Sequence, residues 1–172
     1  MTTAIRLARA LGLAAACALL LPAAALAAPP THAPAVSFPV DLPAGDYCEH
    51  AVVLTNPSFR SKDTQYAPLP DGTIRIRDRG MASSLATDLT TGATVARQGG
   101  SAIEYRFAAD GSIIAIGTGL LFAWYLPGDD SQLGPGLFLV NGRVREVYDT
   151  DGNFVSATFS GKAIDVCEAL GD

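Results

Sequence analysis

Short runs in which apolar and polar residues alternate, separated by turn-forming pairs, dominate the chain from about residue 46 onward. A period of two is typical of a half-buried β-strand. Asp71-Gly72, Asp110-Gly111 and Asp151-Gly152 lie between such runs, and Asp-Gly tolerates the positive φ angles of tight hairpins. We expect strands over residues 47–55, 73–78, 83–90, 93–97, 102–108, 112–117, 120–126, 137–148 with a bend at Asn141-Gly142, 154–160 and 163–167.

No segment combines a helix start, an apolar helical stripe and a glycine stop, so the pattern indicates an all-β chain. We expect an antiparallel meander of about 8–10 short strands. Because successive runs are linked by hairpins, the meander predicts a barrel or barrel-like roll closed by one disulfide. The alternative is a two-sheet β-sandwich, whose terminal strands can also meet.

The first residues have the pattern of an export signal. Arg6 and Arg9 are the only early charges, residues 10–21 are apolar or small, and small residues at Ala25 and Ala27 suit a signal peptidase. We therefore predict a cleaved signal peptide over residues 1–27, a Pro/Ala-rich extended leader over 28–45 and one β domain over 46–172. The apolar run is shorter than the ~20 residues of a membrane-spanning helix. A lipid-modified start at Cys17 is the alternative.

Composition narrows the choice of compartment and partner. The chain has 12 basic and 17 acidic residues and a net charge of −5, which argues against nucleic acid as a partner. Loss of the signal would leave Cys48 and Cys167, and two cysteines in an oxidising compartment most simply form a disulfide. We expect a secreted, extracellular protein that uses no cofactor and no metal.

From Gly92 onward the chain resembles an uncharacterised family of small exported bacterial proteins. Cys48 matches one half of that family's cysteine pair. The resemblance implies export, the disulfide and a β fold, and it supplies no activity. The residues that carry it are Thr91-Gly92, Gly117 and Gly119, Leu121-Phe122, Pro127-Gly128-Asp129, the segment 134–139, Gly142-Arg143, Asp151-Gly152 and the segment 165–170.

The segment 120–126 is the most hydrophobic stretch after the signal. Since every position is apolar or aromatic, both faces of this strand need cover, and an overlying loop at residues 56–69 would provide it. The alternative is a barrel lumen or rim that binds a small apolar ligand, with residues 127–136 as a lid. The candidate ligand pocket consists of Leu121, Phe122, Trp124 and Tyr125.

Other polar constellations favour structural roles. His50 is expected to be structural or exposed, and a pair with Asp165 across the disulfide is its sharpest geometric alternative. Residues 149–153 resemble a calcium loop, but the glycine is misplaced, so a hairpin turn explains them better. Arg75, Arg77 and Arg79 share one strand face and could bind an acidic glycan. A solvated outer face that discourages edge pairing is the simpler interpretation.

Two function classes remain, and a third is possible. The first is an exported, non-catalytic β-barrel module that binds a small hydrophobic ligand or an extracellular protein or glycan partner. The second is a small barrel enzyme of the cyclase or isomerase type, signalled by a cavity with His50 or Glu49 beside Tyr105 or Tyr125. The third is a secreted hydrolase inhibitor that presents the loop 56–70 or 127–136. No residue is assigned a catalytic role.

Overall fold

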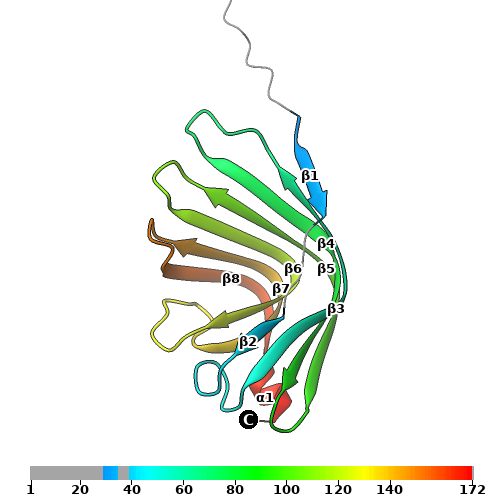
Figure 1. Cartoon of the computed structure of the whole chain (residues 1–172). Helices are drawn as coiled ribbons and strands as arrows, with labels where there is room; N and C mark the ends of the chain where they lie inside the picture. The colour runs from blue at the N-terminus through cyan, green and yellow to red at the C-terminus, as the bar shows by residue number, and fades with distance from the viewer. Residues whose placement is uncertain (1–28, 35–38, 172) are drawn as a thin grey trace, which may run out of the picture.

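The protein is an antiparallel β-sheet protein with one short helix, in a computed structural model that describes residues 29–34 and 39–171. Figure 1 shows strands that curve strongly to one side. The all-β class and the meander are therefore confirmed. The elements are β1 (Thr31–Pro34), β2 (Val40–Leu42), β3 (Val52–Gln65), β4 (Ile74–Asp88), β5 (Thr94–Phe107), β6 (Ile113–Tyr125), β7 (Gly136–Tyr148), β8 (Phe154–Asp165) and α1 (Val166–Leu170).

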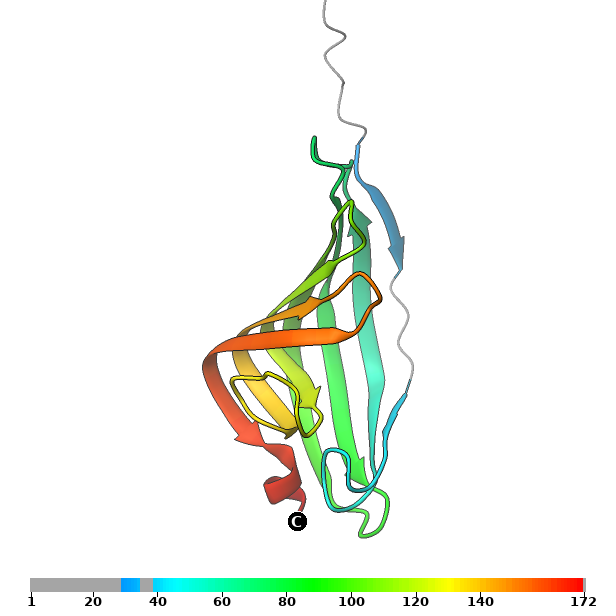
Figure 2. The ribbon, with the colours of Figure 1, turned by 90° about the vertical axis from the view of Figure 1, so that its left-hand side faces the viewer.

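The strands form one sheet in the order β1-β3-β4-β5-β6-β7-β8, and β2 also pairs with β3. Within the described residues no ladder joins β8 to β2 or β3, so hydrogen bonds do not close the sheet into the expected barrel. Figure 2 shows instead an open sheet that coils until β8 crosses in front of the first strands. No helix in the described part of the chain is long and apolar enough to cross a membrane.

The predicted strands merge into fewer and longer ones. β4, β5, β6 and β8 each unite two predicted runs, and β7 continues through Asn141-Gly142, where a bend was expected. Residues 56–69, expected as a covering loop, contribute instead to β3 up to Gln65. Small residues such as Gly80 resemble breaks in the sequence, but they pair in register with neighbouring strands, and this tertiary pairing overrides their low strand propensity.

Both ends of the described chain extend the sheet or cap it. β1 and β2 fall within the predicted leader and pair with β3. At the other end, the strand predicted over 163–167 stops at Asp165, whose side chain accepts a hydrogen bond from the Glu168 N–H and caps α1. The helix was missed because its five residues are too few to show a periodic stripe. The predicted signal peptide lies outside the described residues and stays a prediction.

A disulfide between Cys48 and Cys167 joins the loop before β3 to α1, with a Cα–Cα distance of 5.3 Å. Neither cysteine lies in a strand, so the bond links the two ends of the domain but does not pair the first strand with the last. Around it lies the first core, to which β3, β4, β7 and α1 all contribute. Its fully buried members include Val52, Ala86, Leu137 and Val166.

The second core lies on β6, β7 and β8 and is covered by the loop 126–135. Leu133 of this loop packs on the core, whose members include Leu121 and Val140. The loop is tied to β8, because the Phe159 N–H donates to the Gln132 side chain at 2.8 Å and Gln132 N–H donates to Ala157 O at 3.1 Å. The apolar strip of β6 is therefore covered on one face by this loop and contributes Phe122 to the first core on the other.

A row of glycine and serine crosses the sheet from β3 to β8. A Cβ atom built on Gly80, Gly119, Gly142 or Gly161 would lie less than 3.0 Å from backbone atoms of a neighbouring strand. The backbones can approach this closely only because side chains are missing there. On one side of the row, β5 and β6 stop pairing. The row consists of Ser61, Gly80, Ser101, Gly119, Gly142 and Gly161.

Reduction of the disulfide should destabilise the fold strongly. The cysteines are 119 residues apart, and the chain-entropy model gives about 4–5 kcal/mol for a loop of that length. Urea denaturation of the oxidised protein and of the C48A/C167A variant should show a lower midpoint for the variant. Equal midpoints would show that the bond contributes nothing to stability.

Replacement of Gly142 by alanine should cost roughly 2 kcal/mol or more, because the added methyl meets the Ser160 carbonyl and not a movable side chain. Gly100→Ala is the matched control, since Gly100 is also a strand glycine without positive φ and its nearest neighbour is the flexible Met81 thioether at 3.1 Å. Thermal unfolding followed by circular dichroism measures both. Similar losses in the two variants would contradict the role of the row.

Candidate functional site

A cavity of about 230 Å³ is lined by residues of β5, β6 and β7. Tyr105, Ala115 and Glu146 pair directly across the sheet, and we call the face that they share the pocket face. The walls are mainly apolar and aromatic. The lining residues are Ile103, Tyr105, Ala115, Gly117, Leu121, Phe122, Ala123, Trp124, Val144, Glu146 and Tyr148.

The cavity contains one carboxylate, that of Glu146, and two tyrosine hydroxyls hold it. The Tyr125 hydroxyl donates to Oε1 at 3.1 Å, and the Tyr148 hydroxyl donates to Oε2 at 2.8 Å. Tyr125 is 2% exposed, so its hydroxyl is held in place by the packing around it. The ring of Phe154 packs against both tyrosine rings, at centroid distances of 5.7 and 5.9 Å. Glu146 therefore has a defined orientation before any ligand arrives.

Further acidic groups lie beside the cavity on the same face. Asp78 of β4 pairs directly with Asp63 of β3, and the Ser61 hydroxyl donates a hydrogen bond to Asp78. Burial and then the charge of Asp63 raise the pKa of Asp78. Burial, followed by the charges of Asp78, Glu146 and Asp63, also raises the pKa of Tyr105. Burial is the main cause of both shifts, and the neighbouring carboxylates add to it.

The same physical causes keep the tyrosines of the site neutral. Burial, with the adjacent carboxylate of Glu146 second, raises the pKa of Tyr125 and of Tyr148 well above the ordinary value for a phenol. Their hydroxyls therefore stay protonated and remain hydrogen-bond donors to Glu146 at all physiological pH values.

Of the four residues predicted to form a pocket, Leu121, Phe122 and Trp124 border the cavity, whereas Tyr125 does not line it and donates a hydrogen bond to Glu146. Sequence reasoning missed Glu146 and Tyr148. The available signal was the spacing of Val144, Glu146 and Tyr148, which places all three on one strand face. Their meeting with Tyr105 depends on the register of β5, β6 and β7, which no local pattern specifies.

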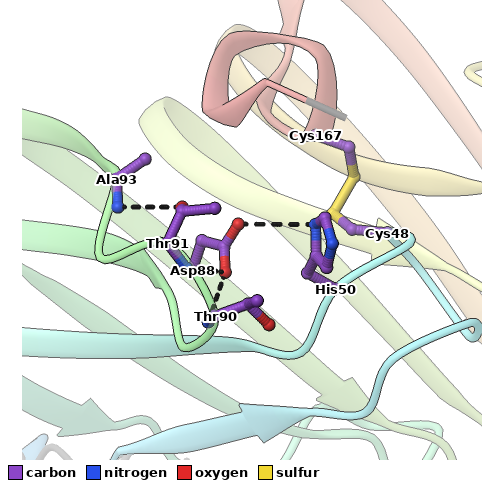
Figure 3. Close-up of polar contacts among 7 residues, drawn as sticks. All are labelled: Cys48, His50, Asp88, Thr90, Thr91, Ala93 and Cys167. Atoms are coloured by element: carbon purple, nitrogen blue, oxygen red, sulfur yellow. Dashed lines mark hydrogen bonds and ion pairs between the residues drawn. A yellow bond between two sulfur atoms is a disulfide. The ribbon is translucent and has the colours of Figure 1, made fainter.

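His50 and Asp88 lie away from this cavity, near the disulfide (Figure 3). His50 Nδ1 is 3.5 Å from Asp88 Oδ2, whereas the expected alternative partner, Asp165, caps α1. The other oxygen of Asp88 accepts the N–H groups of Thr90 at 2.6 Å and of Thr91 at 3.0 Å. Asp88 is 1% exposed. The arrangement closes the β4–β5 turn.

The Asp88 carboxyl is stabilised as an anion. Burial alone would raise its pKa, but the hydrogen bonds from Thr91 and Thr90 and the charge of His50 outweigh this effect, and the pKa is lowered. Glu49 does not line the cavity either. Arg97 is half-buried and donates to the Leu120 carbonyl.

The turn at residues 149–153 uses its carboxylate locally. Asp149 accepts the N–H groups of Asp151 at 2.9 Å and of Asn153 at 2.8 Å, which accounts for the resemblance to a calcium loop. Among residues 29–34 and 39–171, no three His, Cys, Asp or Glu side chains converge on a point that would hold a metal ion.

Comparison of the chain with protein-family models, with curated proteins and with solved structures gave no match. The resemblance to exported bacterial proteins therefore stays an expectation, and the function has to be argued from the site.

Asp88→Asn should reduce stability in a pH-dependent way. The folded-state pKa lies below the unfolded value of about 3.9, so the carboxylate stabilises the fold above that pH, and the contribution disappears as the pH falls through the folded value. Urea denaturation at pH 5 and pH 3 should show a smaller difference between wild type and D88N at pH 3 than at pH 5. A constant difference down to pH 3 would contradict the assignment.

Proposed function

We propose that the protein is an exported, non-catalytic binding module whose pocket takes a small organic cation with an apolar body. The observation that carries this proposal is the Glu146 carboxylate, oriented by two tyrosine hydroxyls within a cavity walled by apolar and aromatic residues. The proposal refines the small hydrophobic ligand expected from the sequence. The refinement follows because a purely apolar ligand would leave this carboxylate desolvated and without a cationic partner.

The chemistry of the site favours a positive charge. Each carboxylate oxygen has two lone pairs, and the tyrosine bonds use one on each oxygen, so an ammonium group can occupy the others. The electron-rich faces of Tyr105, Tyr148 and Trp124 also attract a cation. An anionic ligand would meet the repulsion of Glu146 and of the Asp63–Asp78 pair.

The dimensions of the cavity limit the size of the ligand. Pockets that bind drug-sized molecules measure about 300–1,000 Å³, and this cavity of about 230 Å³ is smaller. One aromatic or branched aliphatic group with a short amine arm is the kind of molecule that fits. Trp124, 37% exposed, stands at the border of the cavity.

The alternative functions receive less support. A cyclase or isomerase would be supported by His50 or Glu49 within the cavity, and neither lines it. The segments considered for a hydrolase inhibitor are not protruding loops, because residues 56–65 belong to β3 and the loop 126–135 is hydrogen-bonded to β8. Binding without chemistry accounts for the oriented carboxylate with fewer assumptions.

Phenethylamine should bind more tightly than its neutral counterpart 2-phenylethanol, and phenylacetate should bind most weakly. Trp124 is the only tryptophan of the chain, so its fluorescence reports occupancy of the pocket directly. Glu146→Gln should reduce the affinity for phenethylamine about tenfold or more, since a partly buried charge-assisted hydrogen bond contributes about 1.5–3 kcal/mol. The affinity for 2-phenylethanol should change little.

The matched control is Glu104→Gln, which removes the same charge from the opposite face of the sheet. It should leave the titration unchanged. Equal binding of phenylacetate and phenethylamine, or equal effects of the two variants, would refute the proposed cation site.

A further inference from the structure

The face of the sheet opposite the pocket is strongly basic, although the chain as a whole is acidic. On β3, β4, β5 and β7, eight of the 12 basic residues lie on this face, which we call the arginine face, and Lys162 of β8 shares its register. The strand pairing assigns these residues to the face, because directly paired residues share a face and every second residue along a strand lies on it. These residues are Arg60, Lys62, Arg75, Arg77, Arg79, Arg106, Arg143 and Arg145.

Apart from Arg60 of β3, these basic residues lie in the interior of the sheet and not at its edge. β4, which contributes Arg75, Arg77 and Arg79, has β3 on one side and β5 on the other. Protection of an exposed strand edge, the simpler interpretation from the sequence, therefore does not explain them. These charged side chains lie on the interior strands of the sheet.

Several of these cations face one another directly. Lys62 pairs with Arg79, and Arg75 pairs with Arg106. Like charges directly opposite on a sheet destabilise it, so the arrangement lowers the stability of the free protein. A cluster that costs stability in the absence of a partner is typical of a binding surface.

Only part of this charge is compensated within the described residues of the face. Three rows of paired residues cross β4 at Arg75, Arg77 and Arg79. Glu104 is the one acidic residue in these rows, and its carboxylate accepts a hydrogen bond from Arg106 Nε at 2.7 Å. The Arg75 guanidinium lies 4.9 Å from the centre of the Tyr66 ring. Lys62, Arg79 and Arg143 belong to a single row across the sheet and are all exposed.

We propose that the arginine face binds a linear acidic polysaccharide. Basic residues recur about every 6.7 Å along the strands, and the step between neighbouring strands is about 4.8 Å, so the face from β3 to β7 extends for about 19 Å. A flexible chain with carboxylates or sulfates on successive sugars can meet several such positions at once. Guanidinium groups bind these planar or tetrahedral anions with paired hydrogen bonds.

Other polyanions fit this surface less well. A single-stranded nucleic acid needs aromatic side chains on which bases stack, and the one aromatic beside these rows, Tyr66, is already covered by Arg75. A sheet face has no helix or ribbon to enter a duplex groove. Peripheral membrane binding relies on inserted apolar residues, whereas Ile114, Ile116 and Val147 are half-buried here. The disulfide also favours an oxidising compartment outside the cytoplasm.

The test is fluorescence anisotropy with a labelled heparin octasaccharide at 50–300 mM NaCl. The wild type should bind, and K62Q/R79Q/R143Q should bind at least tenfold more weakly, with a salt slope reduced by about three. The control, A109E/T150E/A169E, changes the net charge by the same amount at exposed positions in two turns and in α1. Its affinity should stay within about twofold of the wild type.

Three results would overturn the proposal. They are absence of binding by the wild type, equal loss in the charge-matched control, and binding of single-stranded DNA or of phosphatidylserine vesicles as tight as that of heparin. Arg143→Gln alone should still weaken binding severalfold and provides the answer if the triple variant does not fold. Phenethylamine titration of the triple variant should be unchanged, so this test is independent of the pocket.

Discussion

The close approach of neighbouring strands along the Gly/Ser row is the constraint on which the rest of the structure depends. At four of its positions the next strand's backbone occupies the space that a Cβ would need. On one side of the row β5 and β6 separate, so β3 and β4 can pack against Leu137 of β7 and against α1 in the first core. On the other side the strands remain paired as a single layer, whose pocket face is covered over β7 and β8 by the loop 126–135.

The two faces of that single layer differ in charge, although the same strands contribute residues to both. Arg145 and Glu146 are neighbours in the chain, and strand alternation directs them to opposite faces. On the pocket face Asp63 stands opposite Asp78, and on the arginine face Lys62 stands opposite Arg79. Each juxtaposition of like charges lowers stability. The disulfide and the first core, on the other side of the row, contribute stability that offsets these repulsions.

Local signals in the sequence specified the strands and several turns, including Asp71-Gly72 and Asp151-Gly152, and cysteine counting specified the disulfide. They failed where neighbours in space decide the outcome. Asn141-Gly142 looks like a turn in isolation but continues a strand, since Gly161 faces Gly142 across the ladder. The pocket was predicted in part from its apolar strip. Glu146 was missed because one of its hydrogen bonds comes from Tyr125 of β6, whose position relative to Glu146 no local pattern encodes.

Net charge is a poor guide to the partners of such a sheet. A composition of 17 acids and 12 bases suggests repulsion of polyanions at any distance, yet salt limits that repulsion to about 8 Å at physiological ionic strength. Within this range a polymer lying on the arginine face meets mainly its eight cations. Most of the acidic residues lie in turns or on the pocket face, and the sheet separates those on the pocket face from the bound polymer. The charge that governs binding is therefore that of one face, and strand register determines it.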